Sequence, residues 1–127
     1  MIAGNPNIDT ASYDGQSFDY KGQAPYSWGM TFSDDGTKLY VNNEDGTIFQ
    51  YTLSTPRVVS TASYASKSLD YSDQTLDIDS TSIRDNGTKL YLLSYDDFTI
   101  YQYTLATPRD ISTAAYDDKS YEIDEIT

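Results

Sequence analysis

The sequence DDGTKLYV at residues 34–41 returns as DNGTKLYL at residues 85–92. A second pair follows at nearly the same interval, with TIFQYTLSTPR at residues 47–57 and TIYQYTLATPR at residues 99–109. A third segment occurs three times, as TASYDGQSFDY from residue 10, TASYASKSLDY from residue 61 and TAAYDDKSYEI from residue 113. Self-similarity at a spacing of about fifty residues indicates a chain built from copies of one supersecondary unit.

Within each copy the apolar residues recur at every second position, which is typical of β-strands. Leu39 and Val41, for example, alternate with Lys38 and Tyr40. Asp-Gly at 35–36 and Asn-Gly at 86–87 lie between strand-like runs, where glycine adopts the positive φ of a tight hairpin. We predict an inner strand at 27–33, a second at 38–41, a third at 47–53 and an outer strand at 66–71, with the next unit spanning about 78–123.

Four antiparallel strands repeated at this period are typical of β-propeller blades. We therefore predict an all-β propeller fragment that forms a single domain over residues 1–127. Blade 1 is expected at 23–72 and blade 2 at 73–124. Residues 8–22 hold the first of the three TASY copies and predict one extra outer strand, at Gln16 to Tyr20.

The hairpin sequence also resembles a known family. SDDGTKLYV at residues 33–41 resembles the SPDG-(S/T)-K-(L/M)-YV hairpin of YVTN-type and WD-like propeller blades. FQYTLSTP at 49–56, YQYTLATP at 101–108 and STASY at 60–64 resemble tandem repeats of phage and bacterial propeller-like proteins. The second copy departs from the pattern, with IRDN at 83–86 where the first has FSDD at 32–35. The resemblance implies the fold rather than a function, because such folds host enzymes, lectins and scaffolds.

Two blades do not make a ring, since propellers close with roughly four to eight. We therefore expect copies of the chain to join head to tail, and three chains would give six blades as a homotrimer. The surplus N-terminal strand is expected either to clasp a neighbouring copy or to displace that copy's C-terminal strand, because an unpaired strand edge is a pairing template.

Composition excludes several classes of function. The chain has 8 Lys plus Arg against 20 Asp plus Glu and a net charge of −12, which disfavours nucleic acid and membrane surfaces as partners. It has no His and no Cys, so neither a Ser-His-Asp triad nor a thiolate metal site can be built from it. The N-terminal sequence MIAGNPNIDT carries no signal-peptide pattern, and we expect a soluble protein, with a virion-associated location left open.

The two units differ most in the inner strand and the loop before it. Residues 24–33 and 75–84 share no residue at any aligned position. Tyr26 and Trp28 in the first unit stand where Asp77 and Asp79 stand in the second. An aromatic ring stacks on a sugar and carboxylates accept bonds from its hydroxyls, so these four residues are the predicted ligand-binding set. The alternative is that Trp28 fills the wedge between blades and that the two carboxylates are solvated.

Function is predicted as a non-enzymatic, self-assembling module with carbohydrate as the ligand class. One alternative is a purely structural phage or virion ring component without a small ligand. Another is a glycosidase that uses Asp77 and Asp79, because such enzymes need two carboxylates about 5–9 Å apart. No catalytic residue, metal ligand or cofactor is predicted, although the Asp pairs at 34–35, 96–97 and 117–118 offer oxygen ligands to Ca²⁺ as well as turn-forming side chains.

Overall fold

The computed structural model describes residues 7–123 and places them in two four-stranded antiparallel sheets. The first sheet has the order β1-β2-β3-β4 and the second the order β5-β6-β7-β8, so each strand pairs with its neighbours in sequence. The all-β prediction with two four-stranded units is confirmed. The elements are η1 (Ile8–Thr10), β1 (Ser27–Phe32), β2 (Lys38–Asn43), β3 (Thr47–Leu53), η2 (Val59–Thr61), β4 (Ala62–Asp70), β5 (Ile78–Arg84), β6 (Lys89–Ser94), β7 (Thr99–Leu105), η3 (Ile111–Thr113) and β8 (Ala114–Glu122).

Each sheet has a front face and a back face, which strand alternation separates. The front face carries Leu39, Val41, Tyr51 and Leu53 in the first sheet and the aligned Leu90, Leu92, Tyr103 and Leu105 in the second. The back face carries Tyr40, Ile48 and Gln50 in the first sheet and Tyr91, Ile100 and Gln102 in the second. The back face of the first sheet packs on the front face of the second, and this contact forms the larger core cluster.

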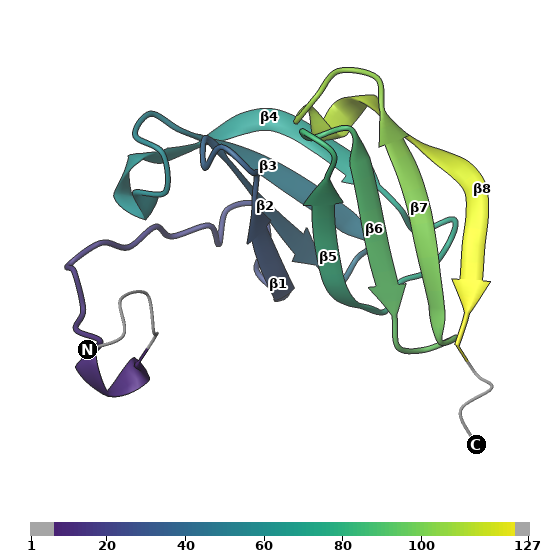
Figure 1. Ribbon diagram of the computed structural model, residues 1–127, viewed down its shortest axis with the longest axis horizontal. Helices are drawn as coiled ribbons and strands as arrows, with labels where there is room; N and C mark the ends of the chain where they lie inside the picture. The colour runs from purple at the N-terminus through teal and green to yellow at the C-terminus, as the bar shows by residue number, and fades with distance from the viewer. Residues whose placement is uncertain (1–6, 124–127) are drawn as a thin grey trace.

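The two sheets pack face to face with their innermost strands, β1 and β5, next to each other. Figure 1 shows β1 and β5 next to each other, while the outer strand β8 lies at the far edge of the second sheet. The segment before β1 runs away from the second sheet. The inner strands of the two units are therefore neighbours.

The β1–β2 and β5–β6 hairpins are each closed by a glycine against an arginine. Gly36 and Gly87 have φ of +76° and +83°, and a Cβ built on them would lie 2.6 and 2.4 Å from Cγ of Arg57 and Arg109, respectively. The backbone N–H of each arginine donates to its glycine's carbonyl at 2.8 Å. This close approach explains why DG or NG and TPR recur together in both units.

The outer strands begin earlier than predicted. β4 starts at Ala62 rather than at residue 66, because a bulge interrupts the alternation between the pairs Gln50↔Lys67 and Tyr51↔Tyr64. Ser66 lies in the bulge with φ of +59°, and Asp118 takes the same φ at the aligned position of β8. The bulge leaves Ala65 and Ser66 without partners on β3, and the positive φ of Ser66 interrupts the extended backbone on which the sequence prediction rested.

The predicted extra strand at Gln16 to Tyr20 is not a strand, and these residues belong to neither sheet. A strand is maintained by ladder hydrogen bonds to a neighbour, and in residues 7–123 β4 and β8 already occupy the outer edges of β3 and β7. Residue 124, the predicted end of blade 2, lies outside the described residues. Across the described part of the chain, no helix has the length and apolarity needed to cross a bilayer.

Gly87→Ala should lower stability by about 1–3 kcal/mol, because alanine is strained at positive φ and its Cβ would overlap Arg109. Thermal unfolding followed by circular dichroism measures the change. Gly22→Ala is the matched control, since its Cβ would meet nothing within 4 Å, and its melting temperature should stay near that of the wild type. Equal melting temperatures for the two variants would contradict this account of the repeat.

Candidate functional site

The inner strands carry the predicted ligand-binding residues on matching bulges. In β1 the register shifts between Ser27 and Gly29, so Trp28 is the extra residue. In β5 it shifts between Ile78 and Ser80, so Asp79 is the extra residue. Bulges re-aim side chains and are common beside functional sites. Both side chains are exposed, with Trp28 61% accessible.

Tyr26 and Asp77 precede these strands and are fixed mainly through their backbones. The N–H of Tyr26 donates to Asn43 Oδ1 at 2.9 Å, and its ring is 64% exposed. The carbonyl of Asp77 accepts from the N–H of Tyr95 at 3.2 Å, and the Tyr95 hydroxyl lies 3.5 Å from Asp77 Oδ1. The nearby Asp77 carboxylate raises the pKa of the Tyr95 phenol.

A pocket of about 360 Å³ opens on the front face of the first sheet beside Trp28. Of the four predicted ligand-binding residues, Trp28 is the one that lines it. Its other walls come from the segment before β1, from β1 and β2, and from η2: Phe18, Tyr20, Ser27, Gly29, Met30, Leu39, Val41 and Val59. Tyr20 is tied to the rim by a 2.6 Å hydrogen bond between its hydroxyl and that of Ser27.

Asp77 and Asp79 do not occupy alternate positions of one regular strand. β5 begins at Ile78, and the bulge at Asp79 interrupts the alternation that predicted their spacing. Strand geometry therefore does not place the two carboxylates on one side, and the glycosidase alternative stays a prediction without this support.

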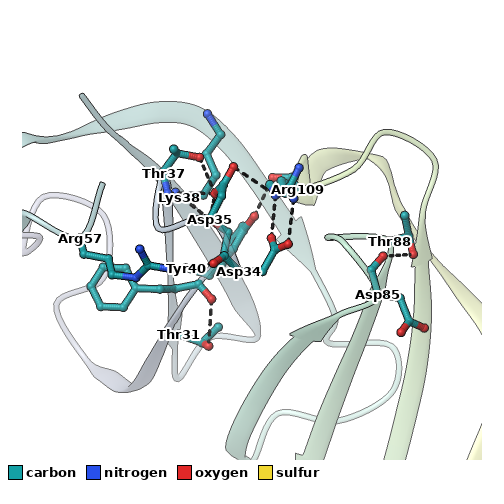
Figure 2. Close-up of polar contacts among 12 residues, drawn as sticks. Thr31, Asp34, Asp35, Thr37, Lys38, Tyr40, Arg57, Asp85, Thr88 and Arg109 are labelled. Carbon is teal, nitrogen blue, oxygen red and sulfur yellow. Dashed lines mark hydrogen bonds and ion pairs between the residues drawn. The ribbon is translucent and has the colours of Figure 1, made fainter. Parts of the chain in front are cut away.

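A second candidate surface emerges from the contact between the two sheets, which depends on the turn after β7. Figure 2 shows Arg109 of this turn reaching Asp34 of the first sheet. Its Nε and Nη2 donate to Asp34 Oδ1 and Oδ2 at 2.7 and 2.9 Å, and the Tyr40 hydroxyl donates to the Arg109 carbonyl at 2.7 Å. Two parallel bonds between a guanidinium and a carboxylate fix orientation as well as distance. The Arg109 hydrogen bonds hold the pKa of Asp34 below its usual range.

The two residues after Arg109 complete the contact. The backbone N–H of Ile111, a fully buried residue, donates to Gln50 Oε1 at 2.7 Å. Asp110 accepts from Lys67 Nζ at 2.6 Å. Although burial opposes it, this bond from Lys67 and those from Ser112 lower the pKa of Asp110. The turn at 109–111 therefore docks on the back face of the first sheet.

The aligned back face of the second sheet has no such turn on it within the described residues. Tyr40, Ile48 and Gln50 are at most 2% exposed, whereas the aligned Tyr91, Ile100 and Gln102 are only half-buried. A shallow groove of about 250 Å³ marks the place. Its walls are Tyr91, Ile100, Gln102, Lys119, Ser120 and Tyr121, each the counterpart of a residue in the first sheet.

The aspartate pairs act mainly in local structure. Asp35 accepts from the hydroxyls of Ser33 and Thr37 at 2.7 Å each, Asp97 from Tyr101 at 2.5 Å, and Asp117 from Gln102 at 2.8 Å. Within residues 7–123, no group of three or more acidic side chains is gathered so as to hold a metal ion.

Sequence reasoning missed both the groove and the pocket residues contributed by Phe18 and Tyr20. The signal was present in the repeat, because Phe18 aligns with Leu69, which packs against the core between the sheets, and Tyr20 aligns with the fully buried Tyr71. In comparisons with known proteins, no family model and no curated protein matches this chain.

Asp34→Asn should lower the melting temperature at pH 7, and the gap to the wild type should close as the solution is acidified. The pKa of Asp34 is depressed in the folded state, so its stabilisation is present above the unfolded value of 3.8 and is lost as pH falls through the folded value. Thermal unfolding between pH 7 and pH 2.5 measures the gap. Asp45→Asn, at an exposed turn carboxylate, is the charge-matched control. A gap for Asp34→Asn that does not depend on pH would refute the role of the ion pair.

Proposed function

We propose that the chain is a non-enzymatic building block of a β-propeller, in which its two sheets act as blades and join the sheets of other copies face to face. The observation that carries the proposal is the difference between Tyr40 and Tyr91, and between Ile48 and Ile100. Each pair shares a residue type and a place in the repeat, yet only the members that meet another sheet are fully buried.

The back face of the second sheet and the front face of the first, on which Phe18 of the N-terminal segment packs, carry the residues of the contact already made inside the chain. Arg57, Val58 and Val59 follow β3 as Arg109, Asp110 and Ile111 follow β7. In a contact between copies, the Val59 N–H takes the place of the Ile111 N–H and donates to Gln102. The Arg57 carbonyl likewise accepts from Tyr91, as the Arg109 carbonyl accepts from Tyr40.

The pocket on the first sheet fits the same arrangement. Leu39 and Val41 line it, and their counterparts Leu90 and Leu92 pack in one core cluster with Tyr40 and Ile48. In the proposed contact, Tyr91 and Ile100 of a second copy therefore enter this pocket, and Trp28 forms one of its walls. Three chains give six blades, within the range of roughly four to eight at which propellers close.

Ile100→Asn should weaken self-association about tenfold or more, because burying an isoleucine side chain contributes roughly 1.5–3 kcal/mol. Its fold should persist, since Ile100 lies outside both core clusters. Native mass spectrometry over a concentration series measures the oligomer. The wild type is expected as a trimer, and more of it as ionic strength rises, because each copy carries a charge of −12.

Ile8→Asn is the control for this experiment, because it makes the same substitution at a residue that is 86% exposed. It should leave the oligomer unchanged. A wild-type chain that stays monomeric at all concentrations, or an Ile100→Asn chain that assembles like the wild type, would overturn the proposed arrangement.

Carbohydrate binding is a second candidate function of the inner strands. It is favoured by the matching bulges that expose an aromatic ring at Trp28 and a carboxylate at Asp79 on adjacent strands. A pyranose stacks its apolar face on such a ring while its hydroxyls donate to the carboxylate.

Asp79→Asn tests this second function without disturbing the proposed contact between copies. Binding to a glycan array should fall while the oligomer mass stays constant, since Asp79 lies outside the groove and the pocket. Asp73→Asn, an exposed carboxylate beyond the inner strand, is the matched control. If the wild type binds no glycan on the array, the carbohydrate-binding function is refuted and the purely structural ring component is favoured.

A further inference from the structure

We propose that the N-terminal arm, residues 11–24, of one copy supplies the fourth strand to the second sheet of its neighbour and displaces β8 from that edge. The inference rests on the proposed self-assembly and deepens it, because it names the segment that exchanges. It also assigns a role to the first TASY copy, which belongs to neither sheet in the single chain.

The N-terminal arm contacts the front face of the first sheet. In the same way, β4 and the loop after it contact the front face of the second sheet. The Tyr51 hydroxyl donates to Gln23, as the Tyr103 hydroxyl donates to the aligned Gln74. The carbonyl of Tyr20 accepts from the N–H groups at 23 and 24, at 3.0 and 3.1 Å, in the same turn that follows β4. The arm therefore already occupies a fourth-strand position next to its own front face.

The arm also has the local backbone shape of a fourth strand. Gly15 aligns with Ser66 and Asp118, the two bulge residues of β4 and β8. These two have φ of +59°, and Gly15 has φ of +75° although it belongs to no ladder. Serine is strained in this region and aspartate is strained less, whereas glycine adopts it freely. The arm is thus bent for the ladder before it has a partner.

The arm of one copy and β8 of its neighbour compete for one position. In the proposed contact, the back face of the second sheet of one copy packs on the front face of the first sheet of another copy. The arm of that other copy then lies beside β7 of the first copy, as β4 lies beside β3 within the chain. β8 of the first copy lies at that same aligned position, along β7. Two segments cannot occupy it together, so one must leave.

Three differences between the competing segments favour the arm. Its bulge residue is Gly15 rather than Asp118, which lowers the backbone strain at positive φ. Its Gln16 already accepts a hydrogen bond from the hydroxyl of Ser60. Lys119 of β8 would instead face the apolar Val58 of the neighbouring copy. Within the chain, the aligned Lys67 faces the carboxylate of Asp110.

The third difference lies in the apolar residue of each segment. Phe18 packs edge-on against Tyr51 with ring centroids 5.1 Å apart. The corresponding residue of β8, Tyr121, is 67% exposed. The arm thus brings a side chain already seated on the adjoining sheet.

Disulfide trapping tests the exchange, because the chain has no cysteine of its own. Gln102 faces Lys119 across the β7–β8 ladder, so in the exchanged form it faces Gln16 of the neighbour. Directly opposed strand residues have Cα atoms about 4.5–5.5 Å apart, within disulfide range. Gln16→Cys and Gln102→Cys chains, given different mass tags, are mixed and mildly oxidised. A disulfide-linked heterodimer should be the main cross-linked product.

A single chain carrying Gln102→Cys and Lys119→Cys reports the unexchanged state. At low concentration it should close an internal disulfide, and in the oligomer closure should slow as β8 leaves. An oligomer by native mass spectrometry without the 16–102 heterodimer overturns the exchange but leaves the proposed assembly standing. A monomer at all concentrations overturns both.

Two further variants shift the competition in a defined direction. Gly15→Ala restores backbone strain to the arm, and Asp118→Gly removes it from β8. Each should reduce the yield of the 16–102 heterodimer about fivefold. If the arm packs only on its own sheet, Gly15→Ala changes the yield of the 16–102 heterodimer and Asp118→Gly does not. An unchanged heterodimer yield in Asp118→Gly would therefore count against exchange.

Discussion

The stacking of one sheet's back face on the next sheet's front face is the contact on which the structure depends. Tyr40 and Ile48 are buried between the sheets, and Ile111 is held against the first sheet by its backbone bond to Gln50. A sheet with apolar residues on both faces needs cover on both, because exposed apolar area is unfavourable in water. One contact inside the chain leaves one face of each sheet without a second sheet, and those two faces have the residues to make the same contact again.

The strand pattern was predictable because it follows from the period of two and from glycine at the hairpins. The third strand was predicted at 47–53, and β3 has those bounds. The bulges were not predictable, since Ser66 gives no local signal for positive φ and an aspartate such as Asp118 gives only a weak one. Only the comparison of the three TASY copies marks that position, because the first copy has Gly15 there. Repeats thus carry structural information that a single copy does not.

The candidate sites were predicted to different degrees. Trp28 was singled out because the inner strands differ between units, and the structure places it on the rim of a pocket. The groove was missed because all its residues but Tyr121 are the same in both units, and their importance appears only when Tyr40 is seen buried and Tyr91 is not. The differences between the repeats thus led to the proposed ligand-binding residues, and the identities led to the proposed contact between copies.

Small departures from identity also distinguish the contact inside the chain from the one proposed between copies. The internal contact has the Lys67–Asp110 ion pair, and the external one would have Val58 in place of Asp110. A buried or half-buried charge is favourable only with a partner, so β8 with Lys119 suits the external contact less well than a segment with Gln16. Repetition alone would let any fourth strand pair with any third strand. In the proposed assembly, these substitutions keep β4 in the internal contact and favour the segment with Gln16 in the contact between copies.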